Sequence, residues 1–419
     1  MCFLGPFFFL VYGLTNWFTA QRADVPSFYF WWETHLPFVP QLMLPYMSID
    51  LFFAGSVFLC RNRAELHRHV QRIVLAILIS ATGFLLFPLK FAFDRPPVDG
   101  FNGWLLELLT GFDKPYNQAP SLHVSLLLFL WVIYSRHLRE PWRYLLHLWF
   151  ILIALSIVLV YQHHVIDVIT GFAVGVLCLY FLPDGVFAPH AVRLTADPSR
   201  RVLGARYALG GLTCALVALG WQGAAWLLLW PAVALLVVAA GYLALGPAVF
   251  QKHGGRHSLA ARWLLAPYLV GAWISYRLYT RGRRPFSRVA ADVFIGRMPR
   301  CREMLRSPWR AVVDLTAEFS SCAAARGVPY ANIPLLDLVA PDAATLRVSA
   351  DEIERARGSG PVLVHCALGV SRSAAAVAGW MVRYGHAASI DEALNRLSQE
   401  WHTIVLSQRH HAALAEAVR

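Results

Sequence analysis

The chain has 419 residues, of which 57% are hydrophobic and only 15% are charged. This composition is too apolar for an ordinary soluble protein, so the default class is a membrane protein. The formal net charge is +12, but the basic residues lie in short segments between apolar stretches, which follows the positive-inside rule and argues against nucleic acid as a partner.

Apolar stretches recur from the N-terminus to about residue 250. Each has roughly 18 to 25 residues, which is enough for a helix to cross about 30 Å of hydrocarbon. We therefore predict eight membrane-spanning helices, near residues 2–19, 38–60, 71–89, 120–137, 144–162, 163–183, 204–221 and 223–250.

The segments between the predicted spans differ in charge. Segments 61–72, 135–143 and 197–206 are basic, which places them and the N-terminus in the cytoplasm. The 14-residue stretch 263–276 precedes another basic segment, so we expect it to be interfacial or re-entrant, with a ninth span as the alternative. We expect a multi-pass protein of a bacterial inner membrane, with its C-terminal domain in the cytoplasm.

The pattern of apolar residues in the sequence changes near residue 285. Ser349 and Glu352 have capping-box spacing at the start of a helix that we expect to end at Gly358. Ser389 and Glu392 repeat this spacing in a second helix. Short β-branched runs alternate with these helices and predict a soluble α/β domain. The predicted strands lie within 292–299, 309–316 and 330–337.

The chain is thus expected to have three parts. A polytopic helical membrane domain with a six-helix core covers 1–185, further spans and interfacial helices with a basic linker cover 186–284, and the α/β domain covers 285–419. The seven cysteines show no spacing typical of metal ligands, so no metal site is expected.

The stretch "PVLVHCALGVSRSAAAVAGW", residues 361–380, predicts a buried strand, a tight loop and the start of a helix. Such a loop directs successive backbone N–H groups and the positive end of the helix dipole at one point, which forms an anion site. Cys366 is expected to be a reactive thiolate at this site. Arg372 can return over the loop to clamp two phosphate oxygens, and Gly369 permits the turn.

This pattern resembles the Cys-x5-Arg signature of the protein tyrosine phosphatase superfamily in its dual-specificity form. The resemblance implies that Cys366 attacks phosphorus to form a phosphocysteine, that Arg372 binds the transferring group and that Ser373 helps the thiolate to leave. An acid must protonate the leaving oxygen; Asp337 holds the matching position, and Asp342 is the nearby alternative. The remaining residues implied at the site are His365, Ala367, Leu368, Gly369, Val370 and Ser371.

Three polar clusters interrupt the apolar membrane domain, where ionisable groups are costly and indicate a function. By the span count, all three lie at the same face of the bilayer and can converge. Ser121 opens a helix whose free N–H groups could hold a phosphate. His163 and Asp167 are four residues apart, so we expect them to share a helical face on which the carboxylate orients the imidazole. The clusters are Lys90 with Arg95, Ser121 with His123, and His163 with Asp167.

At these residues the chain resembles the integral-membrane members of the type 2 phosphatidic acid phosphatase superfamily. The resemblance implies that His163 is the nucleophile, Asp167 its orienting carboxylate and His123 the general acid. It assigns phosphate binding to Lys90, Arg95 and Ser121.

The match to this superfamily has three gaps. Lys90 and Arg95 are separated by four residues instead of six, Ile157 stands where the family has an arginine, and Leu122 replaces a glycine. These gaps bring the region closer to the branch that contains sphingolipid head-group transferases. Hydrolysis and head-group transfer therefore both stay open.

Together these patterns predict a bifunctional membrane phosphatase. A histidine-based lipid phosphate hydrolase or head-group phosphotransferase would face the exofacial side, and a cysteine-dependent phosphomonoesterase would face the cytoplasm. Both would work through a covalent phospho-enzyme without metal or cofactor. Neutral Ala367, Leu368 and Val370 favour a phosphoprotein or small monophosphate as substrate, whereas membrane tethering also suits a phospholipid. The alternatives are a phosphatase whose spans serve only as an anchor or transporter, and a scaffold that binds phosphorylated ligands without turnover.

Overall fold

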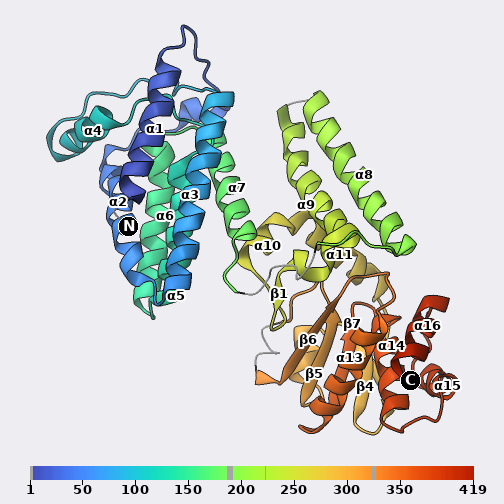
Figure 1. The fold of residues 1–419 in the computed structure, drawn as a ribbon. Coiled ribbons are helices and arrows are strands. Elements are labelled where there is room, and N and C mark those ends of the chain that lie inside the picture. The colour runs from blue at the N-terminus through green and yellow to red at the C-terminus, as the bar shows by residue number, and fades with distance from the viewer. Residues whose placement is uncertain (1–2, 186–191, 222, 323–326) are drawn as a thin grey trace. The chain divides into compact units, whose positions relative to one another are not determined.

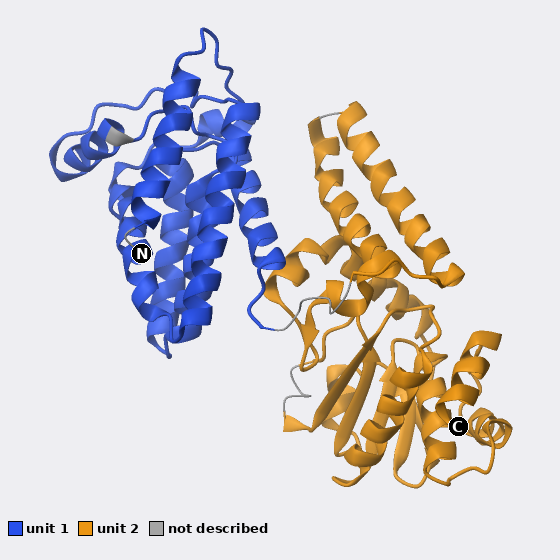
Figure 2. Ribbon diagram, viewed as in Figure 1, with its two compact units in different colours: residues 1–186 blue, residues 187–419 orange. Residues whose placement is uncertain are grey.

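The computed structural model of the protein describes residues 3–185, 192–221, 223–322 and 327–419. The chain forms two compact units, residues 1–186 and 187–419 (Figure 2). Cys2, where the first predicted span begins, and residue 186, where the predicted second part begins, lie outside the described residues.

The first unit is a bundle of apolar helices (Figure 1). Within it, α2 packs on α4, α5 and α6, and α3 packs on α1, α5 and α7. Asn62 caps the third helix by accepting a hydrogen bond from the N–H of Glu65 at 2.9 Å, which satisfies one of the free donors of its first turn. The helices are α1 Leu4–Ala20, α2 Met43–Leu59, α3 Arg63–Leu86, α4 Gly100–Phe112, α5 Leu122–His137, α6 Trp142–Leu159 and α7 Val165–Phe181.

Five helical segments in the described part of the chain are long and apolar enough to cross a membrane, which together with the bundle indicates a membrane protein. Helices α5 and α7 are apolar but shorter. The total of eight spans stays a prediction. The five segments are Pro40–Leu59, Arg63–Leu86, Trp142–Leu159, Pro198–Trp221 and Gly223–Phe250.

The second unit begins with an apolar helical hairpin. Two glycines let its helices approach closely: a Cβ at Gly211 would lie 3.0 Å from the carbonyl oxygen of Ala232, and one at Gly204 would lie 2.6 Å from Leu243. The elements are α8 Pro198–Trp221, η3 Gly223–Leu228, α9 Leu229–Ala240, η4 Gly241–Leu245, η5 Gly246–Phe250, β1 Lys252–His253, β2 Arg256–His257, α10 Leu259–Leu264 and α11 Ala266–Tyr279.

The stretch 263–276, predicted as one interfacial or re-entrant segment, is divided between α10 and α11. Pro267 lies in the first turn of α11, where its missing N–H costs nothing because that donor has no partner in the helix.

A five-stranded sheet forms the rest of the second unit, in the order β3-β4-β7-β5-β6. The β3–β4 pair is antiparallel and the other pairs are parallel. Helices α13 and α14 cover one face (Figure 1) and bury the apolar side chains of the central strands, while α12 packs on the other. The strands are β3 Phe286–Ala290, β4 Val293–Arg297, β5 Ala311–Thr316, β6 Tyr330–Leu335 and β7 Val362–Cys366.

The α/β prediction is confirmed, but one predicted helix start is wrong. Helix α13 is Ala343–Arg357 and begins at Asp342, which caps it, so Ser349 lies in its interior and bonds the carbonyl of Thr345 at 2.7 Å. The helix begins at Asp342 because the longer helix that results has one apolar face. The predicted cap at Ser389 is confirmed, and the remaining helices are α12 Cys301–Leu305, α14 Arg372–Arg383, α15 Ile390–Glu400 and α16 Gln408–Ala417.

The β1–β2 hairpin docks onto the end of β5. Lys252 is fully buried, and its Nζ donates to Asp314 Oδ2 at 2.5 Å and to the carbonyl oxygen of Thr316 at 2.6 Å. His257 adds a contact of 2.8 Å between its Nε2 and the carbonyl oxygen of Ala317. The segment that precedes residue 285 is therefore part of the same packed structure as the sheet.

The ion pair between Lys252 and Asp314 is electrostatically strong. Burial alone raises the pKa of the Asp314 carboxyl, but the Lys252 ammonium outweighs it and the pKa falls to about 2. The hydroxyl of Tyr330 donates a further hydrogen bond to Asp314 at 2.8 Å. Because both charges are out of water, each depends on the other.

We expect Lys252→Met to lower the free energy of unfolding by about 3 to 5 kcal/mol, because it leaves Asp314 buried without its cation. Denaturant unfolding of the purified full-length protein in detergent measures this. The double variant Lys252→Met/Asp314→Asn should recover part of the loss, and Arg302→Met, at an exposed position, should have little effect.

The pH dependence of stability provides an independent check of the ion pair between Lys252 and Asp314. The native pKa of Asp314 lies below the ordinary 3.8. The contribution of its ion pair to the free energy of unfolding is therefore present above pH 3.8 and declines as the pH falls towards about 2. Equal unfolding free energies for the parent and Lys252→Met at neutral pH would contradict this account.

Candidate functional site

The loop 367–371 joins β7 to α14, as predicted. Strand β7 lies between β4 and β5, so its carboxyl end opens at the centre of the parallel part of the sheet. Cys366 is the last residue of this strand and is 3% exposed. Its Sγ accepts the N–H of Gly369 at 3.2 Å and lies 3.4 Å from Ser373 Oγ. The structure thus places the sulfur inside the loop, between the turn and the helix.

Gly369 fixes the shape of this loop. Its φ is +76°, and a Cβ there would lie 2.8 Å from the backbone of Gly296 in β4 and 2.9 Å from the ring of Trp401. The Trp401 Nε1 donates to the carbonyl oxygen of Gly369 at 2.7 Å. Only glycine fits both the backbone angle and the space, so the loop is held from two sides.

Arg372 returns over the loop and is 1% exposed. Its Nη2 donates to Glu318 Oε1 at 2.7 Å and to Asp337 Oδ1 at 2.8 Å, while Nη1 donates to Glu318 Oε2 at 3.0 Å. Burial disfavours the charged guanidinium, but Asp337 and Glu318 outweigh this and raise the pKa of Arg372. Its buried Nε has no hydrogen-bond partner among the described residues. The guanidinium therefore stays charged and keeps one donor open.

Glu318 was missed by the sequence analysis. It follows β5 directly, and the carboxyl ends of neighbouring parallel strands meet at one edge of the sheet, so its position beside β7 could have pointed to it. Its carboxylate forms a two-point pair with the guanidinium of Arg372, the geometry that carboxylate and guanidinium favour.

The two candidate acids have different positions. Asp337 lies just after β6 and contacts Arg372, and the hydroxyl of Tyr242 from η4 donates to its backbone carbonyl at 3.0 Å. Asp342 instead caps α13 by accepting the N–H of Thr345 at 2.7 Å. The structure therefore brings Asp337 to the loop and uses Asp342 in the helix.

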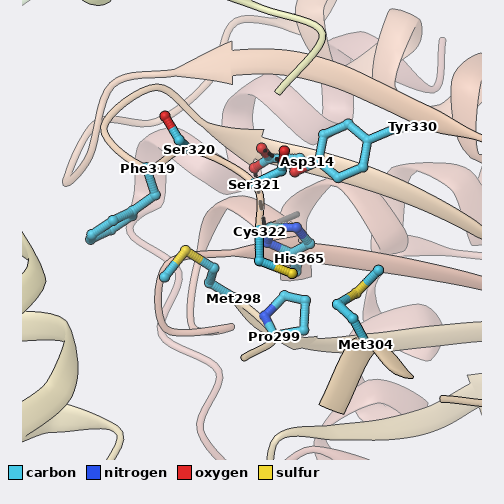
Figure 3. A pocket seen from close by; sticks show the side chains of 10 residues that line it. All are labelled: Met298, Pro299, Met304, Asp314, Phe319, Ser320, Ser321, Cys322, Tyr330 and His365. Atoms are coloured by element: carbon cyan, nitrogen blue, oxygen red, sulfur yellow. Dashed lines mark hydrogen bonds and ion pairs between the residues drawn. The ribbon is translucent and has the colours of Figure 1, made fainter. Parts of the chain in front are cut away.

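His365 lines a small cavity of about 10 Å³ (Figure 3). Its Nδ1 lies 3.3 Å from the carbonyl oxygen of Cys366 and 3.9 Å from Asp314 Oδ1. Burial lowers the pKa of His365. This favours a neutral imidazole that supports the backbone beneath Cys366.

In the first unit, the three predicted clusters lie at one end of the bundle. The end of α3, the start of α5 and the turn between α6 and α7 meet there, and the backbone N–H of Ser121 donates to the carbonyl of Asp167 at 3.0 Å. Ser121 caps α5 as predicted, with its Oγ 3.4 Å from the nitrogen of Val124. His123 stacks on Tyr46 with ring centroids 4.3 Å apart.

The predicted shared helical face of His163 and Asp167 is wrong, because α7 begins at Val165 and His163 lies before it. The two side chains still approach, with His163 Nδ1 3.5 Å from Asp167 Oδ2. The carboxylate turns back to accept the N–H of His164 at 2.8 Å, and this cap brings it beside His163. Helix capping, not helical periodicity, creates the pair.

The two predicted basic ligands are placed differently. The guanidinium of Arg95 donates to the carbonyl oxygen of Tyr161 at 2.7 and 3.2 Å, two residues before His163. Lys90 is exposed in the extended segment after α3, and a bridge between Leu89 and Asn117 holds this segment near the cluster. Arg95 is thus brought to the His163 turn, while the Lys90 side chain forms no ion pair with the described residues.

The side chain of His164 has a structural role. Its Nε2 accepts the N–H of Ala92 at 3.1 Å, and its Nδ1 lies 3.1 Å from Oε2 of the buried Glu33. Glu33 also accepts the N–H of Val165 at 3.1 Å, so it caps α7. Both ring nitrogens of His164 are engaged, whereas His163 stays available. Glu33 could not be found from the sequence, because it lies in η1, the 3-10 helix Trp31–His35, far from His164 in the chain.

The cluster around His163 is rich in unsatisfied polar atoms. Buried native groups normally have hydrogen-bond partners, so several unpaired atoms in one place indicate a ligand or water site. Within the described residues, the buried atoms here without a hydrogen-bond partner are His123 Nε2, Gln162 Nε2, Asp167 Oδ1 and His163 Nδ1, the last of which faces Asp167 Oδ2 at 3.5 Å. In the described part of the chain, no three or more His, Cys, Asp or Glu side chains are grouped as a metal site would require.

Comparison with known families agrees with both resemblances. Residues 69–189 match the model of the PAP2 superfamily, and residues 302–419 match that of the dual specificity phosphatase catalytic domain. The chain is therefore a fusion of two phosphatase-family domains. It joins a PAP2 superfamily domain to a C-terminal dual-specificity phosphatase domain.

Solved structures are similar to part of the chain. Tk-PTP in its active form is 27% identical over 32% of this chain and 97% of its own, with a TM-score of 0.30. A mouse putative dual specificity phosphatase complexed with zinc tungstate is 27% identical over 32% of this chain and 86% of its own, with a TM-score of 0.29. None of the curated proteins that were compared matches the chain.

We expect Glu318→Gln to lower kcat/KM for an aryl phosphate by about tenfold or more, because the Arg372 guanidinium loses a charged two-point partner. Initial rates of p-nitrophenyl phosphate hydrolysis by the full-length protein measure this, with Tm as the check on folding. Glu352→Gln, which removes a carboxylate paired with Arg355 on α13, is the matched control. Unchanged kcat/KM in a folded Glu318→Gln protein would rule out a positioning role.

Proposed function

We propose that the protein is a bifunctional membrane phosphatase with one phosphoryl-transfer site in each unit. The observation that carries the cysteine site is the position of Cys366 Sγ inside a loop over which the charged Arg372 is folded. The phosphatase families matched by both domains support the same class of reaction, phosphoric monoester hydrolysis.

At the cysteine site, the thiolate of Cys366 attacks phosphorus, and the bond from phosphorus to the leaving oxygen breaks. Arg372 and the loop N–H groups stabilise the oxygens of the transferring group. Asp337 gives its proton to the leaving oxygen, and Ser373 stabilises the departing thiolate in the second step. Water then hydrolyses the phosphocysteine, and Asp337 takes the proton of that water.

The ion pair between Asp337 and Arg372 fits this order of events. In the absence of substrate, the two side chains lie 2.8 Å apart, and Glu318 holds the same guanidinium from another side. A phosphate dianion competes for the guanidinium, which frees the Asp337 carboxyl to turn towards the leaving oxygen. Asp337 is also 41% exposed at its side chain, so water can reach it.

At the membrane site, His163 attacks the phosphorus of a lipid phosphate or head group. Asp167 orients the imidazole, His123 protonates the leaving oxygen, and Ser121 with Arg95 and Lys90 binds the phosphate. Two observations support this assignment: the buried His123 Nε2 has no hydrogen-bond partner among the described residues, and His163 Nδ1 faces Asp167 Oδ2 at 3.5 Å. The acceptor in the second step is water for a hydrolase or a lipid hydroxyl for a transferase.

The proposal includes sidedness. The charge pattern of the sequence supports an exofacial membrane site and a cytoplasmic cysteine site in a bacterial inner membrane. The substrates are phosphorylated lipids or phosphoproteins at the cysteine site and lipids at the membrane site.

The two sites should be separable by single substitutions in the full-length protein. We expect Cys366→Ser to abolish hydrolysis of p-nitrophenyl phosphate because no nucleophile remains, and His163→Ala to abolish phosphate release or head-group transfer with lipid substrates. Phosphate assays and lipid mass spectrometry measure the two activities. Cys301→Ser and His67→Ala, at exposed positions, are the matched controls.

Each failure has a distinct meaning. Tight phosphate binding without turnover by the parent would favour a scaffold. Equal lipid turnover by the parent and His163→Ala would indicate that the spans serve only as an anchor or transporter.

A further inference from the structure

One wall of the cysteine site comes from outside the sheet. The hydroxyl of Tyr276 in α11 donates to the carbonyl oxygen of Met298 at 2.8 Å, and its ring centroid lies 5.6 Å from that of Phe319. Tyr276 and Phe319 form a buried apolar cluster with Ala367, the residue after Cys366. Helix α11 therefore packs against the loop that would bind phosphate.

A groove of about 520 Å³ runs between α11 and the loops that contain Met298 and Phe319. This volume is within the range of sites that hold small organic molecules. The lining of the groove contains both apolar and basic side chains. The apolar ones are Leu269, Val270 and Trp273, and the basic ones are Arg262, Arg277 and Arg300.

The three arginines of the groove form no ion pair with the described residues. Arg277 lies over the ring of Trp273, 5.4 Å from its centroid. Arg300 lies near Glu303, whose carboxylate pairs with Arg297 and accepts the backbone N–H of Arg300 at 2.7 Å. Glu318, the acidic residue among the described residues of the lining, is already engaged in an ion pair with Arg372. The three arginines therefore have no carboxylate partner of their own in the lining, and the complementary ligand is an amphiphile with negative charge at one end.

The groove leads to the cysteine site. Its lining includes Glu318, which holds Arg372, and Phe319, which packs against Ala367. A ligand that fills both the groove and the loop must be longer than an aryl phosphate. It must also carry an apolar part beside its phosphate.

The source of such a ligand is indicated by the same compact unit. Helix α11 contacts α9, which belongs to the segment Gly223–Phe250, one of those apolar enough to cross a membrane. Tyr242, at the end of this segment, bonds the backbone of Asp337. The predicted membrane hairpin is therefore tied directly to the cysteine site.

We propose that the groove binds the apolar chain and anionic head of a membrane lipid, so that the substrate of the cysteine site is a lipid phosphomonoester. This inference rests on the proposed phosphatase activity of Cys366. The products are the lipid alcohol and inorganic phosphate, with water as the second reactant. The neutral loop residues Ala367, Leu368 and Val370 are compatible with this, because the groove supplies the positive charge.

The test uses the full-length protein with His163→Ala, so that the membrane site does not contribute. Four probes are compared: dioleoyl phosphatidate in mixed detergent micelles, dihexanoyl phosphatidate in solution, a phosphotyrosyl peptide and p-nitrophenyl phosphate. We expect kcat/KM for the long-chain lipid to exceed that for the short-chain lipid by about tenfold or more, because the chain fills the groove.

Groove variants sharpen the comparison. Trp273→Ala and the double variant Arg262→Gln/Arg300→Gln should each lower the ratio of long-chain lipid to aryl phosphate activity by about tenfold. Arg281→Gln is the matched control, because it removes an exposed charge four residues after Arg277 but does not line the groove. Tm measurements report whether each variant folds.

The outcomes separate this inference from the function on which it rests. Equal activity on the two phosphatidates, a preference for the phosphotyrosyl peptide, or an unchanged ratio in the folded groove variants would overturn the lipid assignment alone. Absence of aryl phosphate hydrolysis, or hydrolysis that persists in Cys366→Ser, would overturn both.

Discussion

The cysteine site depends on the neutralisation of one buried cation. Arg372 is almost completely removed from water, where an unpaired guanidinium would be strongly unfavourable, so anionic partners must surround it. Glu318 follows β5 and Asp337 follows β6, and both reach Arg372 at the start of α14. A single charge requirement thus fixes three loops relative to one another.

This requirement also explains why helices outside the sheet matter. The loop with Glu318 is held at its base by Lys252 and His257, and the loop with Asp337 is held through its backbone by Tyr242. These three residues precede the sheet in the chain. The predicted membrane-linked segment is therefore a support for the two carboxylates that position the guanidinium.

The sequence predicted local features well and distant partners poorly. The loop from Cys366 to Arg372 is contiguous, and its residues have one plausible geometry between a strand and a helix, so it could be predicted. Glu318 and Lys252 could not, because their roles depend on strand order and on a hairpin far away in the chain. For His163, the spacing to Asp167 was informative but the reason was wrong, since a cap at the start of α7, not a helical face, brings the side chains together.

The buried pair between Lys252 and Asp314 has a consequence for the autonomy of the catalytic unit. A protease that cut the chain between residues 258 and 285 would not release an intact soluble phosphatase, because Lys252 would remain with the helical hairpin and its counter-ion with the sheet. Separation of the fragments would expose one charge to water and leave the other without a partner in a low-dielectric interior. The attachment of the sheet to the helical hairpin is thus thermodynamic as well as covalent.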